Sequence, residues 1–158
     1  MSVNDKKHLL EILAEAHLAT RATLKEVDLE TPVYTESGWR IREIIGHIAT
    51  WDQQVAISIN TYREGSEYLI PDLDETEVDY NQKAVEEQQN LSTQQILAEW
   101  EQAYDDLKNA IQGMPADQFP GDMLYPWGDE RGSITRLVEY MVEHVVEHRD
   151  EIVKALQA

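Results

Sequence analysis

The stretch Met141-Val142-Glu143-His144-Val145-Val146-Glu147-His148 combines an apolar helical stripe with two histidines. His144 and His148 are four residues apart, so in a helix their rings project from one face, one turn apart. Apolar residues recur at helical spacing through this region, and they are Ile134, Leu137, Met141, Val145 and Ile152. The pattern predicts an amphipathic helix with a buried stripe and both imidazoles on its flank.

A third histidine, His47, lies on the apolar side of another expected helix, next to Trp51 one turn later. This helix is predicted over residues 39–64, because its apolar positions keep the helical period for far longer than a strand would. Gly46 precedes His47, and a glycine there lowers helix stability by roughly 1 kcal/mol relative to alanine. Close approach of a neighbouring helix or a ligand would explain this glycine, and so would chance packing.

Three more amphipathic segments follow from the same period. They cover residues 4–27, 74–89 and 92–112. Ser92 and Gln95 have the spacing of a capping box, which marks the start of the last of these segments. Ser133 is expected to cap the histidine-bearing helix, which runs to about Leu156. If the second and third segments form one helical region in two pieces, the chain has four long helices.

The segment 113–132 is expected to be a loop, because it is rich in glycine and proline and contains no strand pair with hairpin chemistry. It carries Phe119, Tyr125 and Trp127, which are costly to leave in water and should pack over one end of the bundle. The whole chain, residues 1–158, is predicted to be one all-α domain with a four-helix bundle fold.

Composition excludes several classes of protein. The chain of 158 residues contains 31 acidic and 13 basic residues, a formal net charge of -18. Such a surface repels phosphate backbones and anionic membranes, so neither nucleic acid nor a membrane is expected as a partner. The absence of cysteine rules out disulfides, thiolate metal ligands and a cysteine nucleophile. Without an apolar signal core or a membrane-spanning stretch, a soluble cytoplasmic protein is expected.

Three imidazoles directed into one helical core are suited to a mononuclear metal site. Three protein ligands would leave one coordination position open, as in catalytic rather than structural sites. Neutral imidazole accepts zinc, nickel, iron or copper, so the ligand type alone does not choose the metal. The alternative is a set of half-buried histidines that are hydrogen-bonded to Glu143, Glu147 or Glu151. Glu143 and Glu147 could also orient the imidazoles, or they could be solvated acids.

Three aromatic residues are expected to border the same pocket. Tyr140 lies one turn before His144, Trp51 lies one turn after His47, and Trp127 belongs to the aromatic loop that precedes the last helix. An ordinary aromatic core would explain them equally well. No serine, threonine or lysine stands beside a histidine in a way that indicates a nucleophile, and the sequence assigns no catalytic residue.

Two motifs resemble those of the DinB/YfiT-like superfamily. They are residues 38–52 (GWRIREIIGHIATWD) and residues 144–152 (HVVEHRDEI). The resemblance implies a four-helix bundle with an unusual connection order, often a homodimer. It also implies a divalent metal, zinc or nickel, bound by one histidine of the second helix and two of the last, which are His47, His144 and His148 here. Some members are transferases that use low-molecular-weight thiols, and others are named as metal-dependent hydrolases.

Three hypotheses follow from the sequence. In the first, the chain is a metal-dependent enzyme whose three-histidine site activates water or a thiol cosubstrate, as a hydrolase or a thiol S-transferase acting on a small molecule. In the second, the same pocket binds a small molecule or a toxin without turnover. In the third, the histidines only pack, and the bundle acts through dimerisation.

Overall fold

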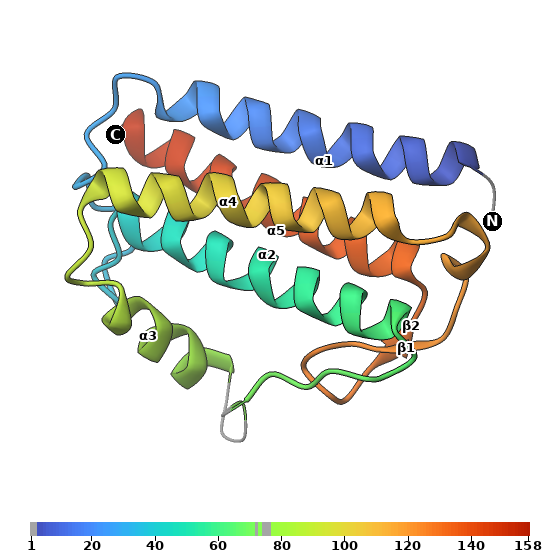
Figure 1. Cartoon of the computed structure of the whole chain (residues 1–158). Coiled ribbons are helices and arrows are strands. Elements are labelled where there is room, and N and C mark those ends of the chain that lie inside the picture. Colours follow the sequence, from blue (N-terminus) through green and yellow to red (C-terminus); the bar gives the residue numbers. More distant parts are fainter. Residues whose placement is uncertain (1–2, 72, 74–76) are drawn as a thin grey trace.

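The computed structural model describes residues 3–71, 73 and 77–158, and it consists almost entirely of helices. The helices are α1 (Val3–Leu24), α2 (Ile41–Arg63), α3 (Glu77–Glu87), α4 (Thr93–Gly113) and α5 (Ile134–Leu156), with a short 3-10 turn at Ala116–Gln118. Figure 1 shows α1, α2, α4 and α5 side by side as a four-helix bundle, with the shorter α3 on the outside of the bundle. The predicted all-α four-helix bundle is confirmed.

Within the bundle, α2 packs chiefly on α4, and α1 packs chiefly on α5. The buried face of α2 is unusually broad: Ile41, Ile44, Ile45 and Ile48 have no exposed surface. This accounts for the isoleucine-rich sequence of α2, since a helix in contact with neighbours on several sides needs apolar residues over more than one narrow stripe. His47 lies within this buried segment.

Most helix ends agree with the sequence signals. The Ser92 hydroxyl accepts a hydrogen bond from the backbone N–H of Gln95, and Ser133 caps α5 in the same way. The first helix ends at Leu24, three residues earlier than expected, because Glu26 has a positive φ of 59° that stops the helix. The expected start of the third helical segment at Asp74 lies outside the described residues.

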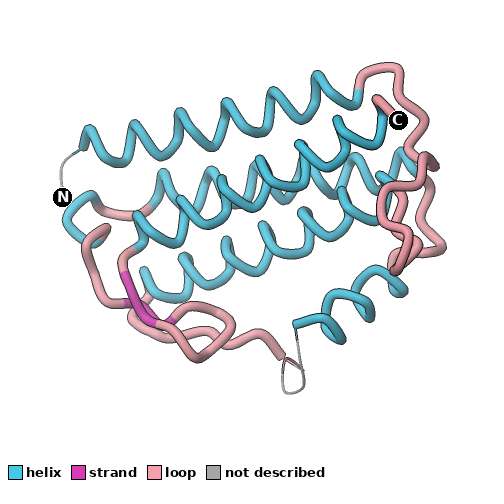
Figure 2. Tube along the Cα trace, turned by 180° about the vertical axis from the view of Figure 1, so that it is seen from behind, coloured by secondary structure: helices cyan, strands magenta, loops and turns pink. Residues whose placement is uncertain are grey.

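A small sheet is present where only loop was expected. β1 (Met123–Leu124) and β2 (Arg131–Gly132) pair antiparallel, with Met123 opposite Gly132. Strands of two residues carry no alternation that a sequence pattern could reveal. Figure 2 shows this pair at one end of the bundle, within the loop segment that joins α4 to α5. Between the strands, the chain turns through residues 125–130, which carry Tyr125, Trp127 and Glu130.

The histidine at position 17 is a packing residue. His17 is buried between α1 and α4, where its Nε2 lies 2.6 Å from Glu101 Oε1 and its ring stacks on Tyr104 with centroids 3.9 Å apart. Arg21 binds the same carboxylate. This group stabilises the contact between α1 and α4 and has no part in the candidate site.

The role of Gly46 is explained by the attachment of α3. A Cβ atom at position 46 would collide with the side-chain amide of Gln88, which lies just beyond the end of α3. The Gln88 Nε2 group donates to the Gly46 carbonyl (3.3 Å) and to the Thr50 hydroxyl (3.2 Å). The glycine therefore permits a close approach of this neighbouring segment to α2.

Candidate metal centre

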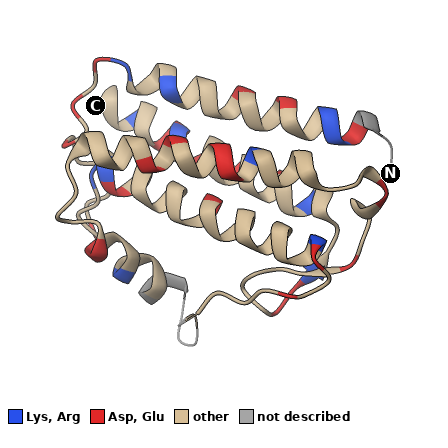
Figure 3. Cartoon of the chain, in the orientation of Figure 1, with Lys and Arg blue, Asp and Glu red and all other residues tan. Residues whose placement is uncertain are grey.

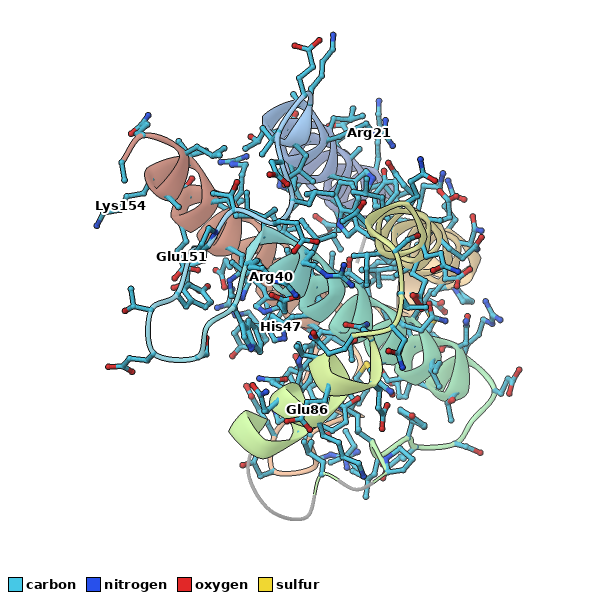
Figure 4. The ribbon with its side chains drawn as sticks, turned by 90° about the vertical axis from the view of Figure 1, so that its left-hand side faces the viewer. Arg21, Arg40, His47, Glu86, Glu151 and Lys154 are labelled. Atoms are coloured by element: carbon cyan, nitrogen blue, oxygen red, sulfur yellow. The ribbon has the colours of Figure 1, made fainter. Side chains whose placement is uncertain are left out.

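The three histidines singled out from the sequence meet at one point between α2 and α5. His144 Nε2 lies 3.0 Å from His47 Nε2 and 3.1 Å from His148 Nε2. One ligand atom from each residue falls within 4.8 Å of the others. In the end-on view of Figure 4, His47 is drawn between Glu151 of α5 and Glu86 of α3. The fold thus brings residues from two distant parts of the sequence into one cluster.

Burial keeps these imidazoles neutral. It lowers the pKa of His47 to about 2, with the nearby His144 and His148 adding to the effect, and it lowers the pKa of His144 to about 3. The pKa of His148 is lowered as well, mainly by burial. Neutral imidazole is the form that binds a metal ion, so the three nitrogens are available as ligands near neutral pH.

The geometry of the cluster fits a bound divalent ion. Two nitrogens at 2.0–2.1 Å from a tetrahedral zinc lie about 3.3 Å apart, close to the 3.0 and 3.1 Å found here. The Nδ1 atom of His144 is buried without a hydrogen-bond partner among the described residues. A metal on Nε2 would place the ring hydrogen on this Nδ1 atom, so the bond from Nε2 to the metal has to offset the cost of one buried N–H group without an acceptor.

Glu151 and Tyr34 orient the ring of His148, and only Glu151 was a candidate partner from the sequence. Its Nδ1 atom lies 2.9 Å from Glu151 Oε1 and 2.9 Å from the hydroxyl of Tyr34, which itself donates to Glu151 at 2.5 Å. Donation of the Nδ1 hydrogen to Glu151 leaves the Nε2 lone pair free for a metal. Burial raises the pKa of Tyr34, with a smaller contribution from its hydrogen bond to Glu151.

Tyr34→Phe is expected to weaken metal binding by roughly tenfold, because partners that orient a ligating histidine contribute 10- to 100-fold to affinity. The measurement is competition with a chromophoric chelator. Tyr68→Phe is the matched control, since that hydroxyl bonds to Gln54 instead of a histidine. Equal affinity of Tyr34→Phe and wild type would mean that Tyr34 only covers the site.

Glu143 does not orient an imidazole. It binds Arg136 on the outside of α5, at 3.2 Å between Arg136 Nη1 and Glu143 Oε1. Of the three carboxylates considered from the sequence, Glu151 is the one in hydrogen-bond contact with a histidine. Spacing alone could not separate them, because all three lie within one turn of a histidine.

A cavity of about 450 Å³ opens beside His47 and His144. Trp51, Trp127 and Tyr140 line it, so the structure places all three expected pocket aromatics around one space. Their role in binding a ligand stays a prediction. Two lining residues were not found from the sequence: Asn81 of α3 and Glu130 of the loop between the strands. No local sequence pattern identifies Asn81 or Glu130 as a residue of a pocket.

The helix α3 holds two tryptophans that border the site. Asn81 Oδ1 accepts a hydrogen bond from Trp51 Nε1 at 2.7 Å, and Gln82 Oε1 accepts one from Trp39 Nε1 at 3.1 Å. The Trp39 ring lies beside His47, with centroids 5.3 Å apart. α3 therefore fixes aromatic side chains around the centre, although it contributes none of the three histidines.

The described residues thus form a four-helix bundle that holds a group of three histidines suited to binding a metal ion. The sequence matches the family described as the mycothiol maleylpyruvate isomerase N-terminal domain over residues 10–152. The chain belongs to this family, and the resemblance to the DinB/YfiT-like superfamily is confirmed. None of the curated proteins matches the chain.

Solved structures share the fold at low sequence identity. The mycothiol-dependent maleylpyruvate isomerase is 14% identical with a TM-score of 0.75, over 93% of this chain and 60% of that one. The present chain therefore spans less than two thirds of that protein. YfiT from Bacillus subtilis, described as a probable metal-dependent hydrolase with an unusual four-helix bundle topology, is 18% identical with a TM-score of 0.72, over 99% of this chain and 89% of that one.

A further relative corrects the expectation about nucleic acid. The colibactin self-resistance protein ClbS, crystallised in complex with double-stranded DNA, is 12% identical with a TM-score of 0.79, over 97% of this chain and 96% of that one. Excluding nucleic acid on the basis of net charge was therefore wrong, because a protein of this fold has been crystallised with DNA. Net charge is a sum over the whole surface, whereas phosphate contacts need only a local group of donors.

Charged residues are spread over all parts of the bundle. Figure 3 shows acidic positions on every long helix, with basic positions among them. Several arginines are held in ion pairs, such as Arg131 with Glu67 and Asp122. Within the described residues, no helix is both long enough and apolar enough to cross a bilayer.

Proposed function

We propose that this protein is a metal-dependent enzyme that acts on a small molecule. His47, His144 and His148 would hold one divalent ion, zinc or nickel, and the reaction would be a hydrolysis or the transfer of a low-molecular-weight thiol. The observation that carries the proposal is the convergence of three Nε2 atoms beside a cavity of about 450 Å³. Three ligands leave room for a fourth, exchangeable one.

Each residue of the centre has a separate task in this proposal. The three imidazoles supply neutral nitrogen ligands, and Glu151 with Tyr34 fixes the ring of His148. Trp39 and Trp51 limit the access of water to His47 from the side of α3. A divalent ion held there supplies Lewis acidity and lowers the pKa of a coordinated water or thiol.

A thiol would have to be a cosubstrate, because the chain contains no cysteine. The family description, which names mycothiol, favours the thiol reaction, and the description of YfiT favours hydrolysis. The chain covers only 60% of the isomerase, so the isomerase reaction of that whole protein is not proposed for this chain.

Binding without turnover is the second candidate function. Glu130 is the one carboxylate among the described residues that line the cavity, and both of its oxygens already accept hydrogen bonds, from Trp127 Nε1 at 3.1 Å and from the Tyr140 hydroxyl at 2.9 Å. A carboxylate held in this way is a poor general base. A cavity without a free base would suit capture of a small molecule.

The first experiment is elemental analysis of protein purified without a histidine tag, beside a His144→Ala, His148→Ala double variant. The expected result is about one equivalent of metal in the wild type, and none in the variant. Metal-loaded protein would then be assayed with panels of esters and amides, and of thiols with electrophiles. No metal in the wild type, even after soaking with zinc, nickel or manganese, would reject the enzyme proposal; metal without turnover in any panel would favour the second candidate.

The homodimer and the cytoplasmic location implied at the sequence level remain proposals. Light scattering on the purified protein tests the first. A mass close to 18.2 kDa would mean a monomer, and twice that mass a dimer.

A further inference from the structure

We propose that the cavity beside the histidines takes a small molecule with a cationic group, such as a quaternary ammonium, and that Trp51, Trp127, Tyr140 and Glu130 hold that group. The inference rests on the proposed function in one respect: it names the class of substrate for the same cavity. The cationic end would lie on the aromatic residues, and the reacting end would lie at the histidines.

The aromatic residues form a continuous wall of tilted rings. The centroids of Trp51 and Trp127 are 6.3 Å apart and those of Trp127 and Tyr140 are 6.2 Å apart, with 59° between the planes in each pair. All three rings have their polar hydrogens engaged, since Trp51 donates to Asn81 while Trp127 and Tyr140 both donate to Glu130. The exposed ring faces carry the negative side of the quadrupole, which attracts a cation.

Glu130 places a negative charge at the same wall. It is fixed by two neutral donors, the indole N–H of Trp127 and the hydroxyl of Tyr140, instead of by an arginine or lysine. Among the described residues no ion pair compensates its charge, and each carboxylate oxygen has a further lone pair. An ammonium group in the cavity would supply the missing countercharge.

The cavity offers no competing cation of its own. Among the described residues that line it there is neither lysine nor arginine. Arg136 is not among the lining residues; it stacks on Tyr140 at 4.1 Å from the ring centroid and pairs with Glu143. That contact demonstrates that the Tyr140 ring accepts a cation on one face.

The spacing between the aromatic residues and the histidines along α2 and α5 sets the distance between the two ends of the ligand. Trp51 follows His47 by four residues on α2, and Tyr140 precedes His144 by four residues on α5. The aromatic layer and the histidine layer are thus one helical turn apart, about 5–6 Å. A ligand that reaches both layers carries its cationic group a few bonds from its reacting group, and a divalent ion at the histidines would favour an electron-rich group there.

The test compares choline with its neutral carbon isostere, 3,3-dimethylbutan-1-ol, by tryptophan fluorescence and calorimetry at constant ionic strength. Choline is expected to bind at least ~10-fold more tightly than the isostere, because the two molecules share their shape and differ in charge. Glu130→Gln is expected to bring the two affinities within about twofold of each other. Trp127→Leu is expected to do the same, which covers the case in which Glu130→Gln fails to fold.

Glu139→Gln is the matched control, because it removes one negative charge from the exposed side of α5, where Glu139 pairs with Arg136. It should keep the preference for choline. Equal binding of the two ligands, no saturable binding of choline, or an equal loss in Glu139→Gln and Glu130→Gln would overturn the proposal. The titrations are made with chelator-treated and with zinc-loaded protein, so a failure of metal binding is seen separately from a failure of cation binding.

Discussion

Alanine at position 144 is expected to lower the affinity for zinc or nickel by at least ~100-fold, more than the loss of any residue that only orients a ligand. His144 is the central member of the group, because its Nε2 atom contacts both His47 and His148. Its removal leaves two nitrogens from different helices, too few for a closed set of ligands. Competition with a chromophoric chelator gives the affinity directly.

His8→Ala is the control for this prediction, because His8 is an exposed histidine on α1, outside the cluster. A second readout is the melting temperature with and without chelator. A metal that binds only the folded state stabilises it by roughly 3–4 kcal/mol at 100 to 1,000 times its dissociation constant. The chelator should therefore lower the melting temperature of the wild type and of His8→Ala, and leave that of His144→Ala unchanged. Undiminished metal binding by His144→Ala would remove the basis for the proposed centre.

Asp52→Asn is expected to stabilise the protein, and to do so more at about pH 8 than at about pH 5. Asp52 is 2% exposed, and its Oδ1 atom has no hydrogen-bond partner among the described residues. Burial raises its pKa from 3.8 to about 8. Between these values the folded state holds a proton that the unfolded state has lost, so the free energy of unfolding falls as the pH rises through this range.

The size of the effect follows from the pKa shift. At 1.36 kcal/mol for each pKa unit, the change from 3.8 to about 8 sets an upper bound of roughly 6 kcal/mol. Relaxation around the carboxylate and the cost of burying an amide reduce it, and a gain of about 1–3 kcal/mol at the higher pH is expected, or roughly 2–10 °C in melting temperature. Thermal unfolding of both proteins at the two pH values measures it. Asp117→Asn, at an exposed position, should show no such trend; a stabilisation by Asp52→Asn that does not grow with pH would contradict the assignment.

Much of the fold was predictable because its signals are local. The helical period runs through α2 and α5 for more than twenty residues each, and Ser92 and Ser133 mark helix starts with their own side chains. The signal failed where the local pattern is too short, as in the two-residue strands at Met123 and Arg131. It also failed at Glu26, where a backbone conformation that few non-glycine residues adopt ends α1.

The histidine group was accessible from the sequence for a different reason. A histidine on a buried stripe needs a partner, and three such residues on two helices favour a shared explanation. Of the partners, Glu151 was one of three carboxylates considered from the sequence, whereas the others were not accessible. Tyr34, Asn81 and Glu130 reach the site from two loops and from α3, and their positions depend on how these segments fold back on the bundle. The exclusion of nucleic acid failed because the net charge does not say where on the surface the charges lie.

The attachment of α3 has a consequence for how such proteins diversify. The three histidines of the proposed centre belong to two long helices whose packing maintains the whole bundle, so they tolerate little change. The side chains that hold Trp39 and Trp51 belong instead to a short helix on the outside, joined to α2 through Gln88 and Gly46. Substitutions of Asn81 or Gln82 in α3 are therefore expected to alter which molecules are accepted, while the three histidines keep their positions. This separation makes the scaffold readily evolvable, in nature and in the laboratory.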